Sequence, residues 1–124
     1  MANPNIVSVA SIYGKTVYDT DIAASAASLV SNAASSGKIY KINSLIISNI
    51  DGTNPADITV TLRNAAGGTT YSTLANTVAV PADATLIIVS KDTSIYLEED
   101  MSLYVLASAA GDLSATCSYE EISE

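Results

Sequence analysis

Histidine, tryptophan and phenylalanine are absent from this sequence of 124 residues, which holds one cysteine and three prolines. Without histidine, the usual zinc sites and the Ser-His and Cys-His pairs of nucleophilic enzymes cannot form. A single cysteine also excludes a disulfide within the chain. Basic residues are scarce, with 5 Lys and Arg against 13 Asp and Glu, and the formal net charge of -8 disfavours contact with a phosphate backbone. We therefore predict no enzymatic activity, no metal or other cofactor, and no nucleic-acid partner.

Long apolar runs are missing as well. The longest apolar stretches lie at residues 44–47, 86–89 and 104–107, whereas a membrane-spanning helix needs about 20 apolar residues. Residues 1–5 are not a basic segment leading into an apolar one, so we expect no signal peptide and no membrane partner. The length suits one domain, made in a cytoplasm, that buries its core without a disulfide or a metal.

Charged residues make up 15% of the sequence, below the roughly 25% that is usual in soluble domains. Serine, threonine and alanine take their place, and hydroxyl groups lose their water at a lower cost than charged groups do. A surface of this kind is suited to being covered by another protein. The alternative is that the small residues reflect only a preference for β-strands.

Alternation of apolar and polar residues predicts β-strands along most of the chain. The clearest strands cover residues 57–63, 101–107 and 113–119, each with a period of two. A longer strand at 38–50 changes phase near 43–46, which indicates a bulge or burial on both faces. Residues 85–90 have the pattern of a fully buried strand, and shorter candidates cover 6–11, 16–18, 69–74, 77–80 and 94–97.

Turn signals separate these runs about every 8–12 residues. This spacing predicts an all-β fold, an antiparallel β-sandwich of jelly-roll or immunoglobulin-like type with about 8 strands. We expect a single domain over 1–124, with residues 1–20 as a candidate N-terminal arm or contact segment and 120–124 as a frayed strand end. Residues 22–37 are open between a strand at about 24–31 followed by a turn, which we favour, and a helix that starts after Thr20 or Asp21.

Acidic residues supply the few candidates for chemistry. Glu98, Glu99 and Asp100 form the densest acidic run, and such a run suits acid–base chemistry or calcium binding. A solvated turn explains it more simply. Asp19 and Asp21 form an Asp-x-Asp pair, but the glycine and glutamate that a calcium loop requires do not follow.

The remaining candidates also favour structural roles. Gly67-Gly68 is interpreted as a turn, because neither a helix start nor a lysine follows it as in a phosphate loop. Cys117 has the inward phase of its strand and is expected to act as a small buried apolar residue. We expect the tyrosines to pack in or cover the sheet and the basic residues to be too few for a patch; these are Tyr40, Tyr104, Tyr119, Lys38, Lys41, Arg63 and Lys91. No catalytic, cofactor-binding or metal-binding residue is assigned.

Residues 37–49 read Gly-Lys-Ile-Tyr-Lys-Ile-Asn-Ser-Leu-Ile-Ile-Ser-Asn. This segment resembles a strand of the small β-sandwich virion proteins of tailed bacteriophages, Gly-Lys-x-Tyr-x-Ile-x-Ser-Leu-x-Ile-x-Asn. Residues 80–86 resemble the Val-Pro-Ala-x-x-Thr-Leu step of the same proteins, and residues 95–103 resemble a later segment, except that Glu99 stands where glycine is usual. These motifs, in this order, cover roughly residues 26–123.

The resemblance implies a non-enzymatic structural protein located in the virion, which is assembled in the host cytoplasm. Its first implication is a capsid decoration, or cement, protein that forms a homo-oligomer, taken as a trimer, and contacts virion proteins such as the major capsid protein. A neck, tail or fibre component is the alternative. A carbohydrate-binding module is a further one, although the lack of tryptophan and phenylalanine leaves it poorly equipped.

Overall fold

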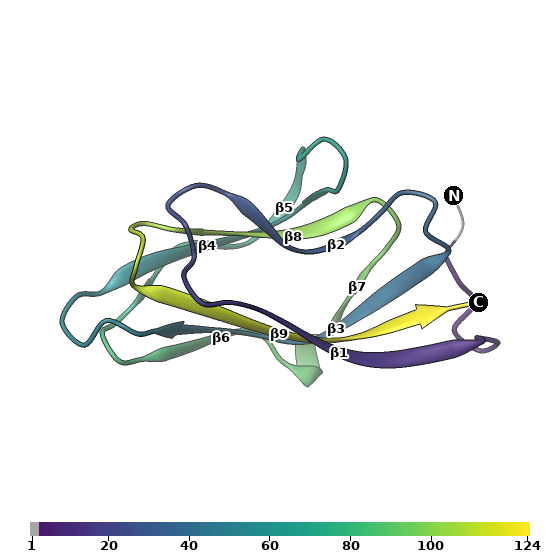
Figure 1. Cartoon of the computed structure of the whole chain (residues 1–124), viewed down its shortest axis with the longest axis horizontal. Helices are drawn as coiled ribbons and strands as arrows, with labels where there is room; N and C mark the ends of the chain where they lie inside the picture. Colours follow the sequence, from purple (N-terminus) through teal and green to yellow (C-terminus); the bar gives the residue numbers. More distant parts are fainter. Residues whose placement is uncertain (1–2) are drawn as a thin grey trace.

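The computed structural model describes residues 3–124, and this part of the chain forms two antiparallel sheets that face each other (Figure 1). The first sheet has the order β1-β9-β3-β6, with β7 also paired to β3, and the second has the order β2-β8-β4-β5. The strands are β1 Ser11–Asp19, β2 Ala27–Asn32, β3 Lys38–Asn49, β4 Ala56–Asn64, β5 Thr70–Val80, β6 Thr85–Val89, β7 Ile95–Leu97, β8 Met101–Ala107 and β9 Leu113–Ser123. A short 3-10 helix, η1 Lys91–Thr93, precedes β7. The predicted all-β antiparallel sandwich is confirmed.

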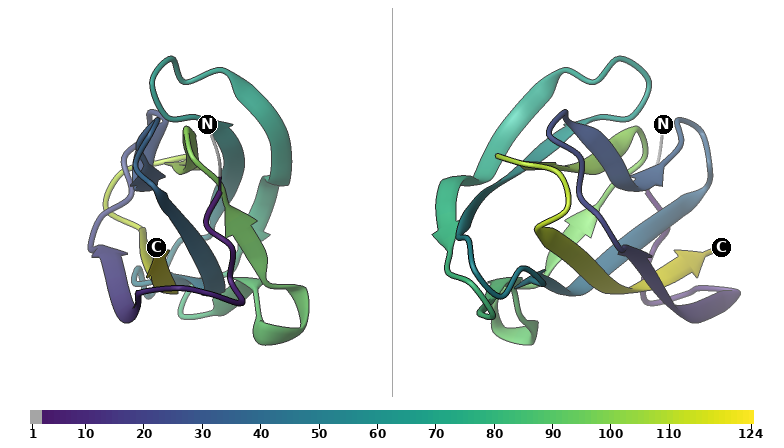
Figure 2. Two further views of the ribbon diagram at one scale, coloured as in Figure 1. Left: turned by 90° about the vertical axis from the view of Figure 1, so that its right-hand side faces the viewer. Right: turned by 60° about the vertical axis from the view of Figure 1, so that its left-hand side comes forward.

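The core lies between the two sheets. It is built from the inward-facing residues of strands in both sheets. The fully buried ones include Ile42, Leu45, Ile47, Ile58, Val60, Leu103, Val105, Leu113 and Cys117. Figure 2 shows the layers from the side and the β4–β5 connection, drawn in teal, which extends beyond the rest of the sandwich. The predicted inward phase of Cys117 is confirmed by its full burial.

β3 runs through the first sheet with a change of phase, as predicted. Its register shifts between Ile42 and Ser44 against β9, and between Leu45 and Ile46 against β6. A bulge adds one residue to a strand and turns the following side chains to the other face. Ile42, Leu45 and Ile47 are therefore all buried although their spacing is not a strict period of two.

Several local predictions are confirmed or corrected by the strands. Residues 22–37 contain the strand β2 and no helix. Residues 69–74 and 77–80 belong to one strand, β5, which bends at Thr77 with a φ of 48°. The predicted strand at 6–11 is wrong, because residues 6–10 form turns and bends and the strand begins at Ser11. Within the segment 1–20, interpreted above as a candidate arm, Ser11–Asp19 form β1 and pair with β9 over their whole length.

Two further corrections concern strands β6 and β9 of the first sheet. The run at 85–90 is not a fully buried strand, since β6 lies at the edge and leaves the side chain of Ile87 62% exposed. The segment at 120–124 is not a frayed end, because β9 continues to Ser123 and is paired on both sides by β1 and β3. In the turn before β8, the residue with a positive φ is Asp100, at 63°, one position after the Glu99 to which the resemblance assigned glycine.

Leu45→Ala is expected to lower the free energy of unfolding by about 2–5 kcal/mol, because it opens a cavity in the core at the bulge of β3. Ile87→Ala removes an exposed side chain and should change the same quantity by about 0.5 kcal/mol. Urea unfolding followed by circular dichroism measures both values. Equal losses in the two variants would contradict the edge position of β6.

Candidate functional site

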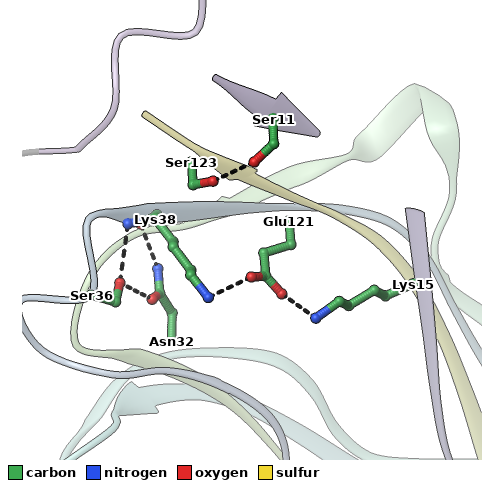
Figure 3. Close-up of polar contacts among 7 residues, drawn as sticks. All are labelled: Ser11, Lys15, Asn32, Ser36, Lys38, Glu121 and Ser123. Atoms are coloured by element: carbon green, nitrogen blue, oxygen red, sulfur yellow. Dashed lines mark hydrogen bonds and ion pairs between the residues drawn. The ribbon is translucent and has the colours of Figure 1, made fainter. Parts of the chain in front are cut away.

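A buried carboxylate joins three strands at one end of the first sheet. Glu121 on β9 is only 6% exposed and forms ion pairs with lysines from both neighbouring strands (Figure 3). Nζ of Lys15 on β1 pairs with its Oε2, and Nζ of Lys38 on β3 lies 2.6 Å from its Oε1. The ion pairs and hydrogen bonds with both lysines hold the pKa of Glu121 below its usual value, and Glu121 raises the pKa of Lys15 and of Lys38. This cluster fastens the edge strand β1 to the sheet.

A buried amide holds the start of β3, which carries Lys38 of this cluster. Asn32, at the end of β2, is fully buried, and its Nδ2 donates to the carbonyl oxygens of Lys38 at 2.9 Å and Leu97 at 3.0 Å. Its Oδ1 accepts a hydrogen bond from Oγ of Ser36 at 2.5 Å (Figure 3). An amide side chain has four hydrogen-bonding positions, and three of them are filled here. The start of β3, and with it Lys38, is held in place by these bonds.

β1 is an edge strand with an exposed apolar surface. Among the described residues, five of the eleven large exposed apolar ones lie at positions 6–18: Ile6 and Val7 in the turn before β1, and Ile12, Tyr13 and Tyr18 on β1, where Tyr13 takes the opposite face to the other two. We call these five residues the β1 surface. The pairing of β1 with β9 has no register shift over nine residues, from Ser11 to Asp19, whereas β2, β5 and β6, at the other sheet edges, pair through registers that shift. The three-residue strand β7, beside β6 on β3, also pairs without a shift. Proline and bulges, two usual guards of an edge, are absent from β1, and its one lysine is held by Glu121.

The acidic turn between β7 and β8 lines a cavity of about 230 Å³. Its lining residues are Asn3, Tyr71, Glu98, Glu99, Asp100 and Met101. The turn lies where the sequence predicts it, but Glu99 is not solvated, because it is only 6% exposed. Its Oε1 accepts a hydrogen bond from the backbone N–H of Gly37 at 3.2 Å, and its buried Oε2 has no partner within the described residues.

The other sequence candidates lie apart from this cavity. Asp19 accepts a hydrogen bond from the backbone N–H of Asp21 and closes a turn after β1. Asp21 accepts one from the backbone N–H of Gly111 and joins this turn to the β8–β9 connection. Burial raises the pKa of the Cys117 thiol to about 12. Within residues 3–124, no group of three or more His, Cys, Asp or Glu side chains is arranged to hold a metal ion. The same residues include no helix long and apolar enough to cross a membrane.

The aromatic and remaining basic candidates belong to the framework. The rings of Tyr40 and Tyr119 pack with centroids 5.2 Å apart, and the guanidinium of Arg63 lies 4.8 Å from the ring centroid of Tyr104. Sequence reasoning missed the roles of Glu121 and Glu99, because a charged residue near a chain end or in a turn is usually solvated. One feature of the sequence hints that Glu99 is unusual, which is that it stands where the resembling phage proteins have glycine.

Comparison with known proteins adds evidence on the fold. No protein-family model matches the sequence, and no curated protein matches it. One similar solved structure comes from Bacillus endospore appendages, described as a novel family of disulfide-linked pili. It has a TM-score of 0.53 and 21% sequence identity, over 91% of this chain and 88% of that chain. A likeness at this level of identity establishes that the two chains share the sandwich fold.

Glu121→Gln is expected to lower the free energy of unfolding by about 1 kcal/mol at neutral pH, because both lysines lose their counter-charge. The folded-state pKa of Glu121 is depressed, so its contribution is complete above the unfolded pKa and is lost as the pH falls through the folded pKa. Urea unfolding between about pH 7 and pH 3 should show the difference from the parent shrinking. Glu120→Gln, on the same strand, is the control, and a difference that stays constant with pH would argue against the cluster.

Cys117 is expected to react with a soluble thiol reagent about a thousandfold more slowly in the folded protein than in urea, because its pKa is raised to about 12 and its side chain is fully buried. Absorbance of the released chromophore at about pH 8 measures the rate. Complete reaction of the folded protein within the time of the unfolded control would contradict the burial of this side chain.

Proposed function

We propose that this protein is a non-enzymatic structural subunit that assembles with further copies of itself and with other proteins. The observation that carries the proposal is the β1 surface on an unshifted strand edge. A regular edge presents a row of unpaired backbone N–H and C=O groups, which another chain can pair with. Exposed apolar side chains beside that row add the burial that makes such a contact stable.

The appendage protein supports a structural role, because its shared fold serves in that case as a building unit of pili. That family is described as disulfide-linked, whereas this chain has one cysteine and buries it. Contacts between copies of this protein therefore rest on noncovalent surfaces. Reducing agents should leave its assembly unchanged.

The resemblance of residues 37–49 and 80–86 to phage virion proteins supports the narrower proposal of a capsid decoration protein. In that role the protein forms a homo-oligomer, taken as a trimer around a local axis, and contacts the major capsid protein. Its net charge of -8 keeps the coated particle soluble. A fibre subunit is the second candidate, which the appendage fold favours. Imaging of purified particles separates the two, because a decoration protein covers the head and a fibre subunit extends from it.

Ile12→Lys with Tyr18→Lys is expected to abolish self-association, because it places charges on the exposed β1 surface without opening the core. Ile50→Lys is the matched control, since Ile50 is 58% exposed and Ile12 is 56% exposed, but Ile50 lies in the β3–β4 loop. Size-exclusion chromatography with light scattering should give the 12.7 kDa monomer for the double variant and the parental oligomer for the control. A parent that stays monomeric at millimolar concentration would refute the proposed function.

A further inference from the structure

β1 lies at an open edge of the first sheet. It ends the strand order, pairs with β9 on one side, and has no strand of residues 3–124 on its other side (Figure 2). None of its nine residues is buried. Because its register against β9 never shifts, its free backbone N–H and C=O groups recur at every second residue along the edge. Another extended strand can therefore pair with this edge over its whole length.

The sequence of β1 has the same pattern of residue types in both directions from Lys15. On either side there is first a residue with a short side chain or none, then two apolar residues, then a polar one: Ser-Ile-Tyr-Gly-Lys-Thr-Val-Tyr-Asp. Strands of an antiparallel pair run in opposite directions, so a strand with this symmetry is complementary to a second copy of itself. The symmetry favours another β1 as the partner of the edge.

The pattern also selects one register for such a pair. A twofold axis at Gly14 would set apolar Tyr13 against the charge of Lys15. An axis at Thr16 would set Lys15 against Val17, which packs against the core. Of these three neighbouring axes, the one at Lys15 alone sets residues of the same kind opposite each other.

This register gives the exposed apolar side chains of β1 a partner. Ile12 and Tyr18 are 56% and 70% exposed, and they lie on the same face of the strand. The axis at Lys15 sets Ile12 of each copy opposite Tyr18 of the other, and on the opposite face it sets Tyr13 against Val17. Pairs of an aromatic and a β-branched residue across two strands stabilise an antiparallel sheet.

Lys15 lies opposite its own copy in this register, and like charges placed directly opposite each other destabilise a pair of strands. The ion pair with Glu121 offsets that repulsion, because each Lys15 brings a carboxylate to the axis together with its ammonium group (Figure 3). Lys38 holds the same carboxylate from the other side, so its position does not depend on a second copy. The lysine at the centre of the contact is therefore paired with a counter-charge before two copies meet.

We propose that β1 pairs with β1 of a second copy, antiparallel and about a twofold axis at Lys15, so that the two first sheets join into one continuous sheet. The inference rests on the proposed function and deepens it, because it names the partner strand and the register. Such a contact uses the same surface on both copies and makes a dimer. It favours a dimer over the trimer that the resemblance suggests, since a threefold ring is built from two different surfaces.

Paired cysteines test the register. Gly14 and Thr16 are exposed and would lie opposite each other across the axis, and a Cβ added at Gly14 meets no atom within 4 Å. The Gly14→Cys and Thr16→Cys variants, mixed while reduced and then oxidised, should form a disulfide between them at least about tenfold faster than either variant links to itself. The reason is distance: Cα atoms of opposite residues are about 5 Å apart and those of diagonal neighbours about 7–8 Å, beyond the usual reach of a disulfide.

Three controls accompany this experiment. Mass spectrometry identifies the linked product, because the two variants differ in mass. The parent, treated with the same oxidant, should stay unlinked, since Cys117 is its one cysteine and is buried. Circular dichroism verifies that both variants are folded. Light scattering of the untreated parent should give twice the chain mass of 12.7 kDa.

Each alternative outcome has a distinct meaning. If the parent associates but the mixture links no faster than the single variants do, the register is refuted while the proposed function stands. A parent that forms a trimer also refutes the twofold pairing and leaves the proposed function in place. If the parent stays monomeric at millimolar concentration, both proposals fail together.

Discussion

The pairing of β3 with β9 is the contact on which the rest of the structure depends. β9 accepts β1 on its other edge, and β3 accepts β6 and β7, so these two strands hold the first sheet together. The bulge in β3 between Ile42 and Ser44 turns Leu45 inward, where a strict alternation from Ile42 would have placed Ser44. The second sheet then has an apolar surface to cover.

The same pairing creates the ionic cluster at the end of the sheet. Because β9 continues to Ser123 between β1 and β3, Glu121 lies between lysines on both sides and is shielded from water. Attraction in this shielded place is stronger than at an open surface, although each lysine remains partly solvated. Lys15, which would otherwise guard the edge of β1, is thereby occupied, and the edge keeps its capacity to pair.

The sequence predicts strands that have one buried face. It does not predict which strands and side chains lie next to them in the fold. β8 has the predicted bounds 101–107, because Leu103, Val105 and Ala107 alternate on its core-facing side. Leu86, Ile87 and Ile88 suit a buried strand equally well, and only the sheet order shows that β6 has no neighbour beyond it. Lys15, one partner of Glu121, lies 106 residues away along the sequence, and a local sequence pattern cannot reveal a contact between residues so far apart. Glu99 is buried for the same reason, through contacts with Asn3 and Gly37.

The beginning and the end of the described strands lie side by side. Ser11 is opposite Ser123 in the register of β1 and β9, their hydroxyl oxygens are 2.7 Å apart, and the backbone N–H of Ala10 donates to the carbonyl of Ser123 at 2.9 Å. A peptide of a few residues can therefore bridge these positions, which makes the fold a substrate for circular permutation with new ends in the β4–β5 connection. Foreign sequences grafted at either original end would emerge from the same pole of the subunit, and a lattice of such subunits would display them in register.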